Sequence, residues 1–155
     1  MNDPSITLLE RRRIEAQIVG PIYRAYAAEL GETKAREILA GVINGLARES
    51  GCLAAEAVGG SSLAHLGSVV EKWNAGGALE LTVIRRDDEA FDFDVTRCRF
   101  AEMYRELGLE DIGDILSCNR DGAMIEGFNP DIGFSRTQTL MGGASHCNFR
   151  YRAGA

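Results

Sequence analysis

The apolar residues of this chain change their spacing near residue 78, from helical intervals to strict alternation, and this change sets the fold class. Helical spacing predicts three helices before that point, over residues 5–31, 33–50 and 61–76. In the first, the apolar positions recur every four residues at Ile14, Ile18, Ile22 and Tyr26. Gly20-Pro21 is expected to kink or divide this helix, because proline removes a backbone donor.

The second predicted helix is expected to be capped by Thr33 and to end near Ser50, with one apolar stripe along it. The third is expected to begin at Ser61 or Ser62 and to stop at Gly76-Gly77.

Alternation then predicts strands over residues 79–83 and 91–95, joined as an antiparallel hairpin by the polar residues between them. A helix over 97–107, capped by Thr96 and closed by Gly108, should follow. Shorter helices are predicted over 110–116 and 117–128, and a final hairpin over 132–151 that turns at Gly142-Gly143. The fold class is therefore α+β, with N-terminal helices followed by a small antiparallel sheet of two hairpins, and with helices inserted between those hairpins.

The 155 residues fit a single domain, residues 1–155, with a helical part (1–77) and a sheet-containing part (78–155). The net charge of −6 argues against a nucleic-acid partner, because phosphate binding needs a basic face. The one basic run, Arg11 to Arg13, alternates with glutamates and is interpreted as a solvated helix face. Its apolar helices are compatible with a homo-oligomer but identify no interface.

The start of the chain, Met1 to Pro4, has neither the basic nor the apolar segment of a leader peptide, and no apolar run is long enough to span a membrane. A cytoplasmic location with four reduced cysteines is therefore expected.

Strand alternation sorts the reactive residues of the final hairpin. It places Cys147 on one face and His146 and Arg150 on the other, so that His146 and Cys147 line one pocket only if the strand bulges. Arg136 falls among apolar neighbours and needs an anion, since an unpaired buried guanidinium is costly. That anion is either Asp121 or a substrate carboxylate.

Cys98 and Cys118 are predicted near helix N-termini, which favour the thiolate form, and either is a candidate nucleophile. The alternative for both is a small buried hydrophobic residue. Asp121 lies one helical turn after Cys118, where it can orient a thiol or water, or simply form a salt bridge. His146 is the candidate proton shuttle, although a lone strand histidine is more often structural.

The order of motifs resembles the L-2-amino-thiazoline-4-carboxylic acid hydrolase family over residues 90–152. The matching residues run from Cys98 and Gly108 through Cys118 to Asp121, Asn129-Pro130, Arg136-Thr137, Gly142-Gly143 and Cys147 to Arg150. The resemblance implies hydrolytic opening of a small acidic heterocycle toward an N-carbamoyl product. It implies catalytic roles for Cys98, Cys118, Asp121 and His146, and substrate binding by Arg136, Thr137 and Arg150.

The layout is also similar to vinyl-reductase-like small-molecule-binding domains, so the alternative function is a sensor module without turnover. Those domains carry a Glu-x-x-Cys-x7-Cys zinc pattern in the final hairpin. Counting back from Cys147, the other two ligand positions hold Thr139 and Arg136, so this zinc pattern is absent and no cofactor is expected. Convergence of Cys98, Cys118, Asp121 and His146 on a metal stays open from the sequence.

Overall fold

A computed structural model describes residues 5–154, and its α+β architecture confirms the predicted fold class. Residues 1–4, on which the expected lack of a leader peptide rests, lie outside the described residues. The elements in chain order are α1 (Leu8–Leu30), α2 (Glu32–Val58), α3 (Leu63–Trp73), β1 (Leu79–Arg86), β2 (Ala90–Cys98), α4 (Arg99–Glu106), a π-helical turn (Asp114–Cys118), α5 (Arg120–Phe128), β3 (Gly133–Ser135) and β4 (Cys147–Arg152).

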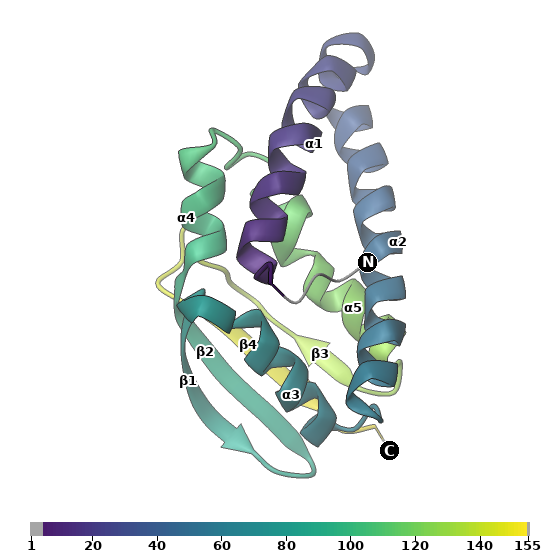
Figure 1. Cartoon of the computed structure of the whole chain (residues 1–155), viewed down its shortest axis with the longest axis vertical. Coiled ribbons are helices and arrows are strands. Elements are labelled where there is room, and N and C mark those ends of the chain that lie inside the picture. The colour runs from purple at the N-terminus through teal and green to yellow at the C-terminus, as the bar shows by residue number, and fades with distance from the viewer. Residues whose placement is uncertain (1–4, 155) are drawn as a thin grey trace.

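The two hairpins form one antiparallel sheet in the order β1-β2-β4-β3, because β2 pairs with β4. Alternate residues of the two central strands, such as Phe93 opposite Phe149, face a cluster formed with α3 and α5. A second apolar cluster lies between α1, α2 and α4. Figure 1 shows α1 and α2 side by side above the sheet, with α3 lying across it.

The first two helices differ from the sequence prediction. Helix α1 continues through Pro21 and is not divided there. Helix α2 begins at Glu32, next to Gly31, so Thr33 is not its cap, and it runs past Ser50 to Val58. It ends where Gly59 adopts a left-handed conformation (φ 77°), which favours glycine.

Gly51 lies inside α2 because the backbone of α5 passes next to it. A Cβ at this position would overlap the carbonyl oxygen of Met124, and one at Gly127 of α5 would overlap that of Arg48. The two glycines therefore let α2 and α5 cross at short range. This contact fixes where α5 holds its N-terminal residues relative to α2.

Two predicted caps are corrected at the other helices. Ser62 caps α3 as expected, but Thr96 lies within β2, where its hydroxyl donates to the carbonyl of Glu80. The cap position of α4 is Cys98, without a side-chain hydrogen bond. Gly108 closes the turn after α4 with a positive φ of 67°, as predicted.

Strand β3 is shorter than predicted, because a side chain replaces its ladder beyond Ser135. The Oδ1 atom of Asn148 accepts from the backbone N–H groups of Thr137 and Gln138, and its Nδ2 donates to the Thr137 hydroxyl. The segment up to Ala144 is therefore a loop that Asn148 fastens to β4.

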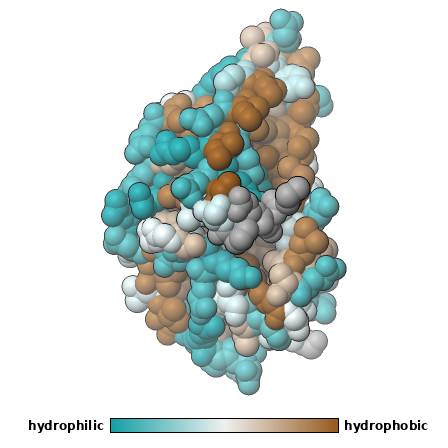
Figure 2. All heavy atoms as spheres, in the orientation of Figure 1, coloured by the Kyte–Doolittle hydropathy of each residue, from teal (hydrophilic) through white to brown (hydrophobic). Residues whose placement is uncertain are grey.

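Large apolar side chains on α1 and α2 remain exposed. Figure 2 shows them gathered over the upper parts of both helices. Within residues 5–154, no helix combines the length and the apolar character needed to cross a bilayer.

Candidate active site between the sheet and helix α5

Arg136 and Asp121 form an enclosed ion pair where the loop after β3 meets the start of α5. The Nη1 atom of Arg136 donates to Oδ2 of Asp121 at 2.5 Å, and its Nη2 donates to the carbonyl oxygen of Cys118 at 2.8 Å. Only 10% of the Arg136 side chain and 21% of the Asp121 side chain are exposed. The predicted inward position of Arg136, facing a carboxylate, is therefore confirmed.

Aromatic rings hold the guanidinium of Arg136 in place from the sheet side. Its central carbon lies 5.1 Å from the ring centre of Phe149 and 5.6 Å from that of Phe134. Cation–π contacts of this kind favour a fixed, partly desolvated guanidinium. The ion pair therefore sits between an aromatic layer and α5.

Burial dominates the pKa of the acidic groups around this ion pair. It raises the pKa of Asp121 to about 6, although the charge and hydrogen bond of Arg136 act in the opposite direction. Burial, followed by the negative charge of Asp121, also raises the pKa of Cys118 to about 12. Cys118 is thus a neutral thiol at physiological pH in this state.

Burial also raises the pKa of Cys98 and Cys147, and the charge of Asp121 contributes in both cases. At Cys98 the backbone N–H groups of Phe100 and Ala101 act to lower the pKa, as a helix N-terminus should, but burial outweighs them. The thiolate alternative for Cys98 and Cys118 is therefore not supported, and both fit the other alternative, a small and largely buried neutral thiol. The charge of Asp121 contributes to the raised pKa of all three cysteines, Cys98, Cys118 and Cys147.

His146, Thr137 and Arg150 do not join this cluster. His146 and Arg150 point to the opposite face of β4, where both meet Asp94 of β2, at 3.7 and 2.9 Å. The guanidinium of Arg150 also donates to the carbonyl of Phe93 at 3.1 Å. Thr137 is exposed and bound to Asn148. The predicted separation of His146 from Cys147 is confirmed.

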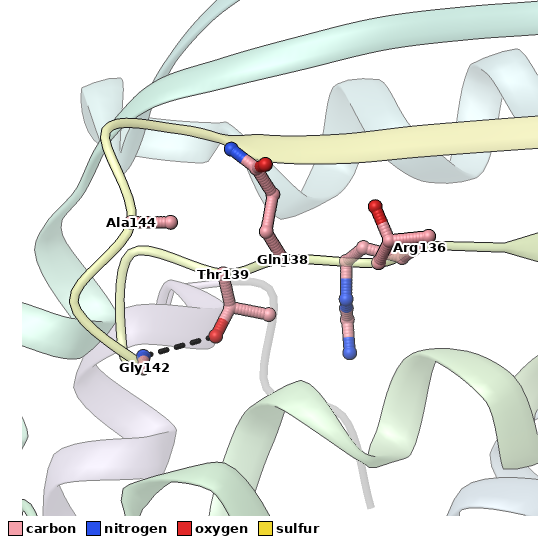
Figure 3. Close-up of a pocket in the computed structure, with 6 residues that line it drawn as sticks. Arg136, Gln138, Thr139, Gly142 and Ala144 are labelled. Carbon is pink, nitrogen blue, oxygen red and sulfur yellow. Dashed lines mark hydrogen bonds between the residues drawn. The ribbon is translucent and has the colours of Figure 1, made fainter.

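Cavities of about 370 and 360 Å³ share Arg136 in their linings. The first lies within the loop after β3, lined by Thr137, Gln138, Thr139, Gly142 and Ala144, and Figure 3 shows the Arg136 side chain extending from that loop toward the helices. The second opens between α2 and α5 and is lined by Asn44, Arg48, Cys118, Asn119, Gly122, Ala123, Glu126 and Phe134. Arg136 thus stands at the border of two spaces large enough for a small molecule, and Asp121 is its ion-pair partner without lining either of them.

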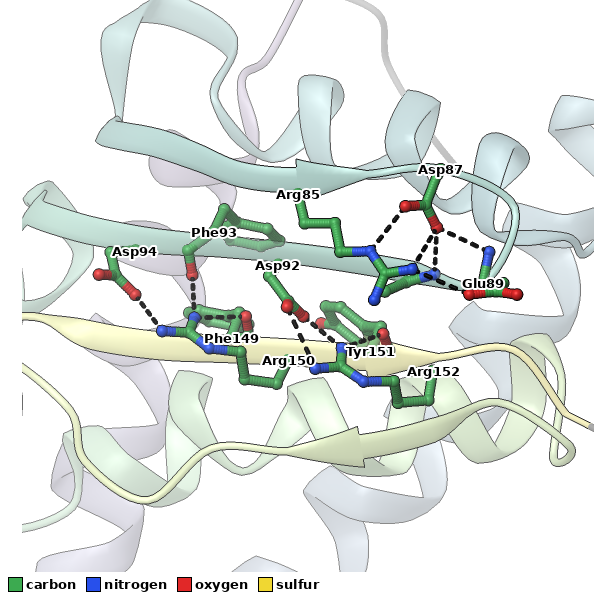
Figure 4. Close-up of polar contacts among 11 residues, drawn as sticks. Arg85, Asp87, Glu89, Asp92, Phe93, Asp94, Phe149, Arg150, Tyr151 and Arg152 are labelled. Atoms are coloured by element: carbon green, nitrogen blue, oxygen red, sulfur yellow. Dashed lines mark hydrogen bonds and ion pairs between the residues drawn. The ribbon is translucent and has the colours of Figure 1, made fainter.

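The opposite face of the sheet is closed by ion pairs. Figure 4 shows Arg150 with Asp94, Arg152 with Asp92, and Arg85 with Asp87 and Glu89 at the β1–β2 turn. These arginines are already paired with carboxylates of the chain. None of these three arginines is therefore free to bind a substrate carboxylate.

A family model described as L-2-amino-thiazoline-4-carboxylic acid hydrolase matches residues 11–151. The chain belongs to this family. The match extends beyond the motifs of residues 90–152 into α1, α2 and α3. No curated protein matches the chain.

A solved structure of similar fold is the phenol-responsive sensory domain of the transcription activator PoxR with phenol. The TM-score is 0.55 at 14% sequence identity, with 88% of this chain and 73% of that chain covered. This level of identity shows a shared fold. This member of the hydrolase family thus shares its fold with the sensory domain of PoxR.

The described residues contain three buried polar atoms without a hydrogen-bond partner, and two of them, in Asn44 and Tyr151, belong to side chains that the sequence did not predict as site residues. Asn44 lines the α2–α5 cavity, and its buried Oδ1 has no hydrogen-bond partner within the described residues. The same holds for Nε of Arg136 and the hydroxyl of Tyr151, which is fully buried. Two sequence signals could have pointed to these residues. Asn44 is a polar residue next to an apolar helix stripe, and Tyr151 is an inward-facing strand tyrosine, and buried polar groups need partners.

The basic run of α1 also differs from its interpretation as a solvated face. Only 14% of the Arg12 side chain is exposed, and Arg12 pairs with Glu15 at 2.8 Å. Glu15 also meets Arg120 at the start of α5, whose pKa is lowered to about 10 by burial and by the nearby charge of Arg12. Helix α1 therefore helps to hold the α5 N-terminus on which Asp121 lies.

Within residues 5–154, no three His, Cys, Asp or Glu side chains come together as a metal site requires.

Proposed function

We propose that the chain is a hydrolase that opens a small acidic heterocycle by adding water to an amidine-like ring carbon. The observation that carries this proposal is the Asp121–Arg136 ion pair, in which Arg136 lines both cavities and donates to the carbonyl oxygen of Cys118. Membership of the hydrolase family supports the reaction class.

Asp121 is the proposed general base. A carboxylate whose pKa is raised to about 6 is still mostly ionised at neutral pH, yet binds a proton more readily than an exposed carboxylate. It would take one proton from water while the water oxygen bonds to the ring carbon and the π electrons of the C=N bond move onto nitrogen. The bond from that carbon to a ring heteroatom then breaks, the hydroxyl proton passes to the nitrogen as the carbonyl forms, and Asp121 returns the first proton to the leaving heteroatom.

Cys118 positions water or substrate in this proposal and does not attack. A thiol with a pKa of about 12 supplies almost no thiolate at neutral pH, and the thiolate is the nucleophilic form. His146 lies across the sheet and is given no step.

Substrate recognition is assigned to Arg136 and Asn44. Both Nη atoms of Arg136 are engaged within the chain, so its unpartnered Nε is the donor available to a substrate carboxylate. The unpartnered Oδ1 of Asn44 can accept from an exocyclic amino group. An amino-substituted ring acid supplies both partners.

The test is turnover of the purified protein on a panel of cyclic amidines, imides and lactams, with ring-opened products identified by mass spectrometry. Asp121→Asn should abolish turnover, and Asn44→Ala should raise KM more than it lowers kcat. Cys52→Ala is the matched control, because Cys52 is exposed. No hydrolysis of any ring in the panel would end the enzyme proposal.

The second candidate is a small-molecule sensor without turnover, favoured by the PoxR-like fold and the absence of a lowered thiol pKa at the three buried cysteines. A ligand that raises the melting temperature and is recovered chemically unchanged indicates the sensor. Covalent modification of Cys118 during turnover, seen by intact-mass analysis, would instead restore the thiol nucleophile.

A further inference from the structure

The hairpin of α1 and α2 turns a band of large apolar side chains toward solvent. We call this band the α1–α2 apolar face, and Figure 2 shows it over the upper parts of both helices. Its members are between 37% and 61% exposed, and they are Ile14, Ile18, Ile22, Tyr26, Leu30, Ile38, Val42, Leu46 and Leu53. A continuous apolar surface of this kind marks a contact with another molecule more often than isolated exposed residues do.

The core of the protomer is complete without these side chains. The buried residues of the two helices are Ala16, Gly20 and Tyr23 of α1 and Ala35, Ile43, Ala47 and Gly51 of α2. Most of them are small, and the large apolar residues named above lie outside this buried set.

Two glycines within α2 point to a second helix approaching from outside. Glycine lowers helix stability, and at Gly51 the passing α5 backbone explains its presence. At Gly41 and Gly45 nothing in the described chain lies within 4 Å of where a Cβ would be. Both are exposed beside Val42 and Leu46, where the lack of a side chain allows close packing by another helix.

We propose that the α1–α2 apolar face is the interface of a homodimer, in which two α1–α2 hairpins pack as a layer of four helices. About half of each of the nine side chains is exposed on average. At roughly 120 Å² for a whole aliphatic side chain, the face offers about 550 Å² of apolar area. Two copies then bury about 1,100 Å², above the roughly 1,000 Å² expected of a specific interface.

The charged residues near the two ends of the α1–α2 apolar face favour a second copy of the chain as the partner, with its α2 antiparallel to that of the first. Lys34 and Glu49 lie on either side of Val42, at roughly 12 and 11 Å along α2. Both are exposed. A twofold axis near Val42 therefore brings Lys34 of each copy opposite Glu49 of the other. The apolar residues around Val42 of the two copies then contact each other.

The experiment measures the mass of the purified chain by light scattering after size-exclusion chromatography, over a wide range of protein concentration. The wild-type protein should be a dimer. The Ile22→Glu/Val42→Glu variant should be a monomer with an unchanged circular dichroism spectrum, because both side chains are already half exposed. Ile84→Glu is the matched control: Ile84 lies on β1, is as exposed as Val42, and its substitution should leave the dimer intact.

A charge exchange tests the same interface without touching the apolar residues. Lys34→Glu should weaken the dimer by roughly twofold to thirtyfold in Kd, since each dimer contains two such pairs, and adding Glu49→Lys should restore it. A monomeric wild-type protein at every concentration overturns the proposal. So does a dimer that survives Ile22→Glu/Val42→Glu, and failure of the exchange to restore dimerisation overturns the antiparallel arrangement.

Discussion

Asp121 and Asp111 each pair with an arginine, yet the structure predicts opposite effects of pH on their contributions to stability. Burial raises the pKa of Asp121 to about 6 despite its bond to Arg136. At the surface, the hydrogen bond from Arg24 lowers the pKa of Asp111. The difference between the two pairs is therefore solvation, with the ion-pair chemistry held constant.

The size of the Asp121 effect follows from its pKa in the two states. Between the unfolded value of 3.8 and the folded value of about 6, the folded protein keeps a proton that the unfolded chain has lost. The free energy of unfolding then falls as pH rises through this window, by about 1.4 kcal/mol per unit and about 3 kcal/mol in total. Above it the carboxylate is ionised in both states and the cost stays constant.

The assay is urea denaturation of the wild-type protein and of Asp121→Asn and Asp111→Asn, between about pH 4 and pH 7. Subtracting the Asp121→Asn curve from the wild-type curve cancels the other titrating groups. The difference should decrease by about 3 kcal/mol as pH rises. For Asp111→Asn the difference should have the opposite sign and be smaller, because water screens this exposed pair.

A flat or rising Asp121 difference curve would refute this reasoning. It would mean that the attraction of Arg136 exceeds the desolvation of the carboxylate, so that the folded pKa is not raised. The same result would remove the physical basis for Asp121 as a general base near neutral pH.

Three further outcomes are expected. Gly51→Ala should destabilise the fold by about 1–3 kcal/mol in chemical denaturation, because the new Cβ overlaps the α5 backbone, whereas Gly122→Ala, in ordinary van der Waals contact, should not. Arg136→Lys should retain the charge and remove the Nε–H that is assigned to the substrate carboxylate, weakening acidic-substrate binding by roughly 1–3 kcal/mol; unchanged affinity and melting temperature would contradict it. Iodoacetamide should modify exposed Cys52 well before Cys118 in peptide mass spectra, and equal rates would contradict the raised pKa of Cys118.

The sheet and the placement of Arg136 were predictable because strand alternation has a period of two and leaves little freedom of phase. Once Phe149 and Tyr151 face the core, His146 and Arg150 must face away, as the structure confirms. The pairing of β2 with β4, which joins the hairpins into one sheet, depends on contacts between distant segments and left no local signal.

Helix ends were predicted less well, because a threonine before an apolar stripe is only one of several ways to begin a helix. The cap position of α2 is Gly31 and not Thr33, and Thr96 lies in β2, where it is bonded to Glu80 of β1. The choice between a thiolate and a buried neutral thiol at Cys98 and Cys118 could not be made from the sequence for a similar reason, and the structure favours the neutral thiol. A helix N-terminus is a local property that sequence reveals, whereas burial, which outweighs it at Cys98, depends on the whole fold.

The stripe on α1 shows most clearly what periodicity leaves open. Recurrence every four residues correctly places Ile14, Ile18 and Ile22 on one side of a helix, but it does not say which way that side faces. The deciding signal was the second stripe, Ala16, Gly20 and Tyr23, in which two small residues let the helix approach its neighbours closely. A helix with two apolar stripes has two surfaces to bury. The protomer buries the stripe of Ala16, Gly20 and Tyr23, and the stripe of Ile14, Ile18 and Ile22 remains for a partner.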